Sequence, residues 1–234
     1  MSKHLKRHFS PKSWKIKRKG IVYITKPSPG PHKIEMALPL NVILRDMLGY
    51  AATNREAKFM LANKDITVDG IRRRDLKFPV GLFDVLSLND IGEHFRIILD
   101  KKGSITLIKI SKDESGLKLC KIIGKSIMKG MKGKAQLNLY DGKNMLVEKD
   151  SYKVGDVVLV DLSDKKSMIK DHIKLAKDSL IFLTGGKHIG GTGKVQDIAG
   201  NRIIYKTEKG DVVETLKKYA FPVGRDKPLI KLTQ

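Results

Sequence analysis

Between residues 39 and 63 apolar positions recur at helical spacing and predict two short helices. Pro39 precedes the first group, Leu40, Val42, Ile43, Leu44, Met47 and Leu48, and Gly49 follows it, which is the order typical of a helix start and stop. Thr53 and Glu56 then form a capping-box pattern, in which each side chain satisfies a backbone amide at a helix start. The second helix is expected to bury Ala57, Met60 and Leu61.

After residue 65 the pattern changes to that of a hairpin. Two β-like runs, 66–68 and 71–74, flank Asp69-Gly70, and this dipeptide favours a type I′ turn with positive φ at both positions. Because strand side chains alternate, Arg72 and Arg74 are expected on one side and Arg73 on the other. Residues 79–88 are expected to form one closing strand.

The stretch from 89 to 170 is a succession of short β-like runs, which predicts an all-β region. The runs are Phe95–Leu99, Ser104–Ile110, Leu117–Ile123, Gln136–Tyr140, Asn144–Val147 and Val157–Leu162. A basic segment with spaced glycines, 125–134, lies among them. It either follows a phosphate backbone, through Lys129, Lys132 and Lys134, or is a mobile surface loop.

The last stretch, 171–234, pairs strands with a glycine-rich loop. A strand is expected over 179–184, and five glycines follow within nine positions, 185–193. Glycine allows close approach of a backbone to its partner. The candidate contacts there are Lys187, His188, Gly190, Gly191, Gly193 and Lys194. Three further strands are expected around 203–206, 211–215 and 221–224.

Charge changes the picture, because the formal net charge is +22. Residues 1–34 hold ten Lys or Arg and no acid, and each later stretch also carries a positive excess. Such a chain favours a polyanion, since binding releases condensed counterions. The candidate contacts of this arm are Lys3, Lys6, Arg7, Lys12, Lys15, Lys17, Arg18 and Lys19. Phe9 and Trp14 lie within this arm, where an aromatic ring could stack on an exposed base, but the simpler interpretation of Trp14 is that it pins the arm to the next domain.

Several classes of protein are excluded by the same inventory. A single cysteine, Cys120, permits no disulfide framework within the chain and no multi-cysteine metal site, and favours a reducing compartment. Its apolar neighbours place it in a core. No apolar run is long enough to span a membrane. The sequence contains no recognisable set of catalytic residues. We therefore expect that the protein is not an enzyme, binds no cofactor, metal ion or small-molecule substrate, and has no membrane partner.

Two parts of the chain resemble known modules. The helix pair and hairpin over 39–88 resemble the S4 RNA-binding module, with Asn63 where many members carry glycine. That resemblance implies phosphate contacts by Arg45, Arg55, Lys58, Arg72 and Arg74, beside which Arg73 lies in sequence. The strand and glycine-rich loop near the C-terminus resemble the KOW motif of small β-barrels.

The order of the modules resembles the archaeal and eukaryotic S4e family of small-subunit ribosomal proteins, and the short C-terminus favours an archaeal member. The implied fold is α+β, with a basic N-terminal arm (1–38), a small α/β S4-type module (39–88), a β-rich central domain (89–170) and an SH3-like KOW barrel (171–234). The arm is expected to order only on binding.

The implied function is that of a structural constituent of the small ribosomal subunit. The partners would be small-subunit ribosomal RNA and neighbouring ribosomal proteins, and the location cytoplasmic and ribosome-associated. The alternative is an RNA-modifying or transcription-associated factor that uses the same modules.

Overall fold

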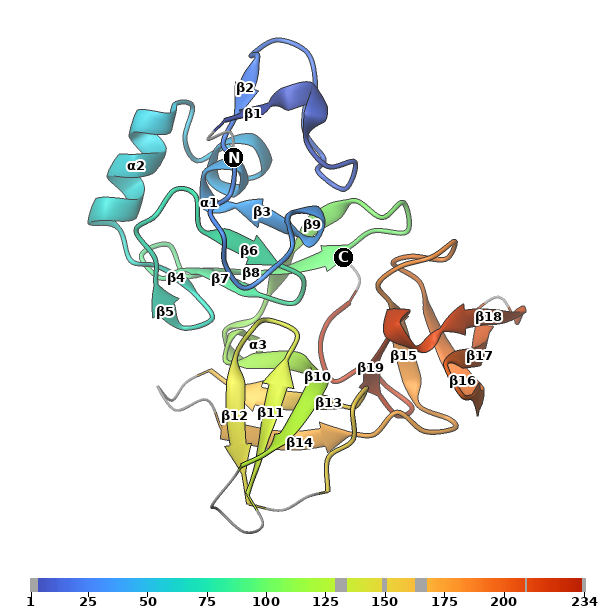
Figure 1. The fold of residues 1–234 in the computed structure, drawn as a ribbon. Coiled ribbons are helices and arrows are strands. Elements are labelled where there is room, and N and C mark those ends of the chain that lie inside the picture. Colours follow the sequence, from blue (N-terminus) through green and yellow to red (C-terminus); the bar gives the residue numbers. More distant parts are fainter. Residues whose placement is uncertain (1–3, 129–133, 149–150, 163–167, 209, 233–234) are drawn as a thin grey trace. The chain divides into compact units, whose positions relative to one another are not determined.

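The computed structural model describes residues 4–128, 134–148, 151–162, 168–208 and 210–232, and the chain divides into two compact units (Figure 1). Unit 1 comprises Met1–Leu99 and Ser104–Gly116, and unit 2 comprises Asp100–Gly103 and Leu117–Gln234. Strands dominate both units. No helix among these residues has the length and apolar character that crossing a membrane requires.

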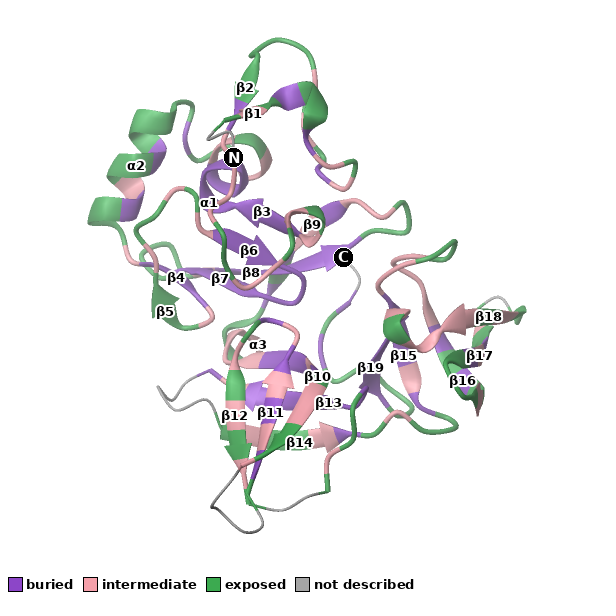
Figure 2. Cartoon of the chain, in the orientation of Figure 1, coloured by how far each residue is buried: buried purple, intermediate pink, exposed green. Residues whose placement is uncertain are grey.

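Unit 1 is built on an antiparallel sheet in the order β5-β4-β7-β8-β9. Its strands are β4 (Ile66–Val68), β5 (Ile71–Arg72), β7 (Val85–Leu88), β8 (Glu93–Leu99) and β9 (Ile105–Ile110). Two smaller pairs accompany it: β1 (Leu5–Lys6) with β2 (Tyr23–Ile24), and β3 (Ala37–Pro39) with β6 (Pro79–Gly81). Figure 2 shows β3, β6, β7 and most of β8 as buried, which locates the core of this unit.

The helices of unit 1 are short. They are η1 (Arg7–Phe9), η2 (Ile34–Met36), α1 (Leu40–Val42), η3 (Ile43–Met47), α2 (Asn54–Asn63) and α3 (Lys112–Ser115). The first predicted helix is confirmed as the continuous pair α1 and η3, of which η3 is a π-helical turn. The second is confirmed as α2 with Thr53 as its N-cap. The predicted hairpin is also confirmed, because φ is +51° at Asp69 and +73° at Gly70.

The single closing strand predicted over 79–88 is wrong, because the chain turns between β6 and β7. Phe83 there takes a φ of +63°. The buried Asp84 carboxylate accepts the Gly81 N–H at 2.8 Å and contacts His32 Nε2 at 2.9 Å. A buried carboxylate needs such partners. These hydrogen bonds form only when the backbone turns between β6 and β7. The two strands therefore pair with different neighbours, β6 with β3 and β7 with β4.

The sheet of unit 1 continues beyond residue 88. Strand β8 pairs with β7 in register from Val85↔Arg96 to Leu88↔Glu93, and β9 extends the sheet further. The expected boundary between 88 and 89 thus falls between two hydrogen-bonded strands, and the boundary at 170 falls within β14. As a division into functional modules, the four-part scheme stays a prediction.

Unit 2 contains two antiparallel five-stranded sheets. The first, in the order β12-β11-β10-β13-β14, consists of β10 (Leu117–Ile127), β11 (Ala135–Leu139), β12 (Asn144–Val147), β13 (Val157–Asp161) and β14 (Met168–Ile173). The second, in the order β18-β17-β16-β15-β19, consists of β15 (Leu180–Leu183), β16 (Thr192–Ala199), β17 (Arg202–Thr207), β18 (Val212–Leu216) and β19 (Ala220–Gly224), with η4 (Lys217–Tyr219) before β19. This second sheet is open, with β18 and β19 at its edges, so a closed KOW barrel remains a prediction.

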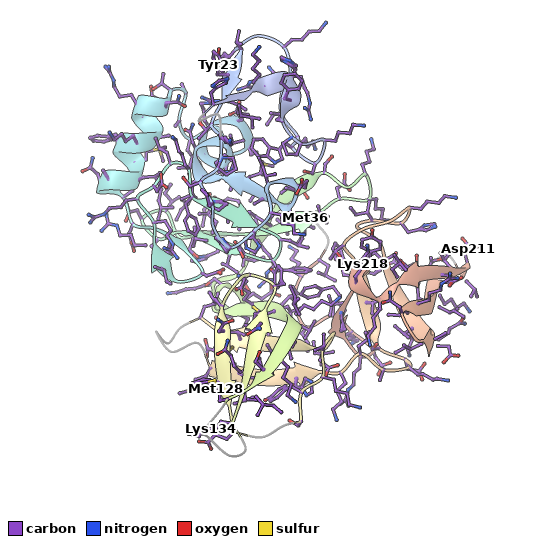
Figure 3. All side chains as sticks on the ribbon, viewed as in Figure 1. Tyr23, Met36, Met128, Lys134, Asp211 and Lys218 are labelled. Atoms are coloured by element: carbon purple, nitrogen blue, oxygen red, sulfur yellow. The ribbon has the colours of Figure 1, made fainter. Side chains whose placement is uncertain are left out.

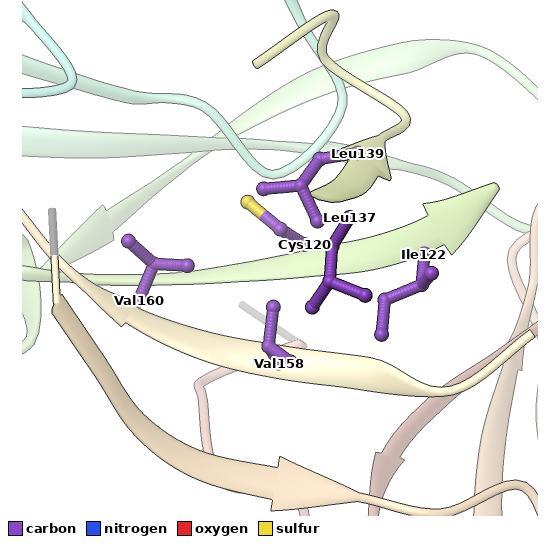
Figure 4. Close-up of a cluster of buried hydrophobic side chains, with 6 residues drawn as sticks. All are labelled: Cys120, Ile122, Leu137, Leu139, Val158 and Val160. Atoms are coloured by element: carbon purple, nitrogen blue, oxygen red, sulfur yellow. The ribbon is translucent and has the colours of Figure 1, made fainter. Parts of the chain in front are cut away.

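Cys120 lies in the core of the first sheet of unit 2. It is 1% exposed and packs with Ile122, Leu137, Val158 and Val160, as Figure 4 shows. The interpretation of this cysteine as a small apolar core residue is confirmed. The alternation of buried and half-buried residues along β11, from Ala135 to Leu139, is that of a sheet with one face inward.

Lys121 joins the two sheets of unit 2. From β10 its Nζ donates to the carbonyl oxygens of Lys217, Lys218 and Ala220 at 2.5–3.2 Å. Desolvation on burial, and secondly repulsion by the Lys217 charge, lower the pKa of Lys121 from 10.5 to about 8. The buried site of Lys121 therefore stabilises the charged ammonium form less than water does.

We expect unit 2 to become more stable as the pH rises from about 8 to about 10.5. Over that range the unfolded chain keeps the proton on Lys121 while the folded chain releases it, so the free energy of unfolding increases with pH. Urea unfolding at several pH values measures this. The rise should be absent in Lys121→Met, and an equal rise in that variant would contradict the assignment.

Candidate nucleic-acid interface

The start of α2 is rigidly built and presents two cations. The Thr53 hydroxyl accepts the Glu56 N–H, and the Glu56 carboxylate accepts the Ala52 N–H at 2.8 Å. The latter bond, and then the Thr53 hydroxyl, lower the pKa of Glu56. Arg55 and Lys58 are exposed on the first turns of this helix and have no ion-pair partner among the described residues. Their contact with phosphates, which the resemblance to the S4 module implies, stays a prediction.

Arg45 lies beside that helix start but is already engaged. Its guanidinium contacts the Asn54 side chain at 2.7 Å and the Asp46 carboxylate at 2.7 Å. Asp46 also accepts a hydrogen bond from Arg7 at 3.2 Å. This carboxylate of the first helix therefore bonds both to Arg45 of the same helix and to the arm. Sequence reasoning missed this role of Asp46, because the acid and its two arginines are brought together only by folding.

The three arginines of the hairpin do not form the alternating set that was predicted. Strand β5 ends at Arg72, so Arg74 does not share its register. Arg72 donates to the Ala62 and Lys64 carbonyls at 3.1 and 3.2 Å and so satisfies the C-terminal end of α2. Arg73 stacks on the Phe78 ring, with its Cζ 4.3 Å from the centroid. Arg74 is exposed and without a partner among the described residues.

The basic arm packs within unit 1, while its ordering only on binding stays a prediction. Its two arginines have structural roles. Arg7 is 4% exposed and donates to the Lys17 carbonyl at 2.8 Å as well as to Asp46. Arg18 donates to the Ser10 and Pro11 carbonyls at 2.7 and 2.8 Å. Arginine suits this work because its planar fork donates several hydrogen bonds at once.

Five lysines of the arm face outward. Lys6, Lys12, Lys15, Lys17 and Lys19 are all exposed, and none has a side-chain partner among the described residues. Lys3 lies outside the described residues. In this part of the arm the two arginines make internal hydrogen bonds, whereas these five lysines are exposed.

Trp14 pins the arm, and the stacking alternative is wrong for this residue. Its side chain is 2% exposed and its Nε1–H donates to the Ile34 carbonyl at 3.3 Å. Next to it, the Ile105 N–H donates to the Ser13 carbonyl at 2.7 Å, which joins the arm to the edge strand β9. A ring so enclosed has no face left for a base.

The glycine-rich loop of unit 2 uses its backbone internally. The N–H groups of Gly190 and Gly191 donate to the Leu183 and His188 carbonyls at 2.8 and 3.1 Å. At Gly193, a Cβ would lie 2.5 Å from the Tyr205 ring, so glycine is required for strand packing. These glycines shape the turn, and the amides of Gly190 and Gly191 are not available to a phosphate.

What the loop does offer is side-chain charge. Lys187 and His188 are exposed, and Lys194 reaches Asp226 at 3.1 Å. In the basic segment of the central region, Lys134 is exposed at the start of β11 (Figure 3) and lies 3.6 Å from Glu148. Lys129 and Lys132 lie outside the described residues. The RNA role of all these positions stays a prediction.

Exposed aromatic residues are the feature that sequence reasoning underused. Phe59 on α2 is 65% exposed, four residues after Arg55 and adjacent in sequence to Lys58. Phe59 is not among the residues of that helix predicted to be buried, and this already indicated that its ring is exposed. Phe9 and Tyr23 in the arm are exposed as well.

Two family profiles match the chain. Ribosomal family S4e matches residues 91–167, and the RS4NT (NUC023) domain matches residues 1–35. The first match covers the end of unit 1 and most of the first sheet of unit 2, and the second covers the arm.

Relatives match over nearly the whole length. The chain is 46% identical over 236 residues to small ribosomal subunit protein eS4 of Methanosphaera stadtmanae, covering 98% of this chain and 95% of that protein. It is 43% identical over 243 residues to the eS4 protein of Methanococcus aeolicus, covering 98% and 97%. The crystal structure of the 30S ribosomal protein S4e from Thermoplasma acidophilum superposes with a TM-score of 0.68 at 33% identity, covering 81% of this chain and 95% of that one.

Proposed function

This chain belongs to ribosomal family S4e, and on that premise we propose that it binds and stabilises folded ribosomal RNA as a constituent of the small ribosomal subunit. The family is one of ribosomal structural proteins, not of enzymes. The partners we propose are small-subunit ribosomal RNA and neighbouring ribosomal proteins, with a cytoplasmic, ribosome-associated location. No small-molecule substrate is part of the proposal.

The observation that carries the proposal is the set of exposed cations without acidic partners. Among the described residues of unit 1 it comprises Arg55, Lys58 and Arg74 together with five lysines of the arm, Lys6, Lys12, Lys15, Lys17 and Lys19. Holding many like charges at the surface of a folded unit is unfavourable unless a polyanion neutralises them. Arginine and lysine contacts to phosphates would position the protein on RNA without reading its sequence.

Sedimentation of cell lysate tests the ribosomal role directly. We expect the protein to co-migrate with small ribosomal subunits, and a free pool alone would overturn the proposal. A transcription-associated factor predicts comparable affinity for duplex DNA and structured RNA at one fixed salt concentration. An RNA-modifying factor predicts altered nucleosides after incubation with RNA, and either result would favour that alternative.

Variants of the α2 cations are expected to make the salt dependence of RNA binding shallower. Each lost phosphate contact removes about 0.7–0.9 from the slope of log affinity against log salt concentration. Arg55→Ala and Lys58→Ala should each show this change in a titration against purified small-subunit RNA.

The matched control is Arg202→Ala on β17, which removes the same charge from a residue that is paired with Glu214 at 3.0 Å. Its slope should equal that of the unchanged protein. Equal slopes for all three variants would mean that α2 does not contact phosphates.

A further inference from the structure

The arm carries an exposed apolar surface within its most basic region. Phe9, Ile21, Val22 and Tyr23 are 71%, 64%, 59% and 54% exposed. Exposed apolar side chains mark an interaction site where they form a contiguous patch, and Ile21, Val22 and Tyr23 follow one another directly along the chain. Tyr23 lies at the outer end of the arm in Figure 3.

The β1–β2 ribbon fixes one half of this surface. Lys6 lies opposite Tyr23 in register, and the next pair, Leu5 with Ile24, faces inward with Ile24 buried. Because strand side chains alternate, Lys6 and Tyr23 share the outer face. The His4 ring meets the Tyr23 ring edge to face at 5.5 Å between centroids. The outer face therefore combines a phenol, an imidazole and an ammonium group.

A second ring pair follows directly along the chain. After Lys6, the Arg7 N–H donates to the Val22 carbonyl at 2.8 Å, and η1 then places the His8 and Phe9 rings 4.2 Å apart. This pair is braced from behind. The buried Ser10 hydroxyl donates to the Arg7 carbonyl at 2.7 Å, and Arg18 donates to the Ser10 carbonyl. A braced platform loses less conformational freedom when it binds a partner.

The charge around the rings indicates the chemistry of that partner. Residues 1–34 contain no Asp or Glu, and Lys6 and Lys19 are exposed near the rings in sequence. The centre of a protein interface is normally depleted of charge, and Lys is among the residues depleted there. Flat rings set among lysines instead suit a ligand with flat apolar faces and anionic links, which describes unpaired nucleotides.

We propose that the two exposed ring pairs of the arm, His4 with Tyr23 and His8 with Phe9, stack on unpaired bases of RNA beside Lys6. The inference rests on the proposed function and deepens it, because it names the RNA feature that the arm takes. Sequence reasoning considered stacking for Phe9 and Trp14. Trp14 is buried, so the role is left to Phe9 and extends to Tyr23, whose rings are exposed. Duplex RNA offers no such free base faces.

The test compares two RNA probes of equal phosphate count, a hairpin with a single-stranded loop and a perfect duplex. Base stacking on an aromatic side chain changes affinity by roughly 5- to 150-fold per ring. We expect Phe9→Ala and Tyr23→Ala each to lose affinity in this range for the looped hairpin. Affinity for the duplex and the salt slope with both probes should stay unchanged, because no cation is removed.

Phe9→Tyr should retain binding of the looped hairpin, because it preserves the flat ring. Leu146→Ala, which shortens an exposed apolar residue of β12, should change neither affinity. Circular dichroism confirms that each variant is folded. The inference would be overturned if the alanine variants lost equal affinity for both probes or lost none. It would also be overturned if they bound RNA normally but a neighbouring protein were missing from purified subunits. Failure of the unchanged protein to bind either RNA would instead refute the proposed function.

Discussion

Replacing Trp14 with alanine is expected to lower the free energy of unfolding of unit 1 by about 3–5 kcal/mol, the usual cost of removing a large buried aromatic side chain. Trp14 is 2% exposed; it hydrogen-bonds to Ile34 near the end of the arm and pairs with Ile105 of β9, which holds the arm against the sheet. Without it, the contacts of the neighbouring Ser13 backbone with β9 lose their support. The arm should then become accessible to trypsin at its exposed lysines.

Urea unfolding and limited trypsin digestion measure the two effects together. The control is Trp14→Phe, which retains most of the buried ring but loses the hydrogen bond from Nε1 to the Ile34 carbonyl. It should cost only about 1–2 kcal/mol and leave the arm protected. Equal stability of the alanine and phenylalanine variants would contradict the role of Trp14 as the pin of the arm.

Lys118→Met is expected to destabilise unit 2 by about 3–5 kcal/mol, because it leaves a buried carboxylate without its partner. Lys118 Nζ lies 3.0 Å from Asp141 Oδ2, and both side chains are 1% exposed. Burial by itself raises the pKa of Asp141, but attraction to Lys118, their hydrogen bond and the nearby Lys143 outweigh it. The folded pKa of Asp141 therefore lies below its usual value.

The sign of the pH dependence distinguishes this pair from ordinary packing. In the unchanged protein the lowered pKa of Asp141 contributes stability above its unfolded value of about 3.9, and that contribution is lost as the pH falls. In Lys118→Met, burial dominates and raises the pKa, so lowering the pH should reduce the defect.

The double variant Lys118→Met with Asp141→Leu should recover most of the lost stability, since no buried charge remains. Urea unfolding at about pH 4 and pH 7 measures all three proteins. The opposite result is a loss of stability in Lys118→Met that is the same at both pH values and remains in the double variant. That result would show that lost packing, rather than an unpaired charge, is responsible.

Local features of this chain followed from local sequence. The Thr53 capping box and the Asp69-Gly70 turn each depend on residues within a few positions of one another, and both formed as expected. The strand Asn144–Val147 matches its predicted bounds, and the other predicted strands of the region 89–170 are shifted at their ends only. Cys120 was placed correctly because its neighbours in sequence are its neighbours in the core.

Sequence reasoning missed the features that form where distant residues meet. The turn at Phe83 depends on Asp84 and His32, which lie 52 positions apart. The folded arm depends on Asp46, which accepts from Arg7 across 39 positions, and on Trp14 reaching Ile34. Periodicity within a short window carries no information about such partners.

By itself, the sequence determined that this protein is a strongly basic, strand-rich chain with an S4-like helix pair and hairpin, because periodicity, capping and net charge are properties of the chain alone. Only the tertiary structure decided which of its cations are available. Arg7, Arg18 and Arg72 are held by carbonyl or carboxylate oxygens, whereas Arg55, Lys58 and the exposed arm lysines from Lys6 to Lys19 have no such partner among the described residues. The reason is physical: a charge near the core must find oxygen partners within hydrogen-bonding distance, and which oxygens come that near is settled only when the chain has folded.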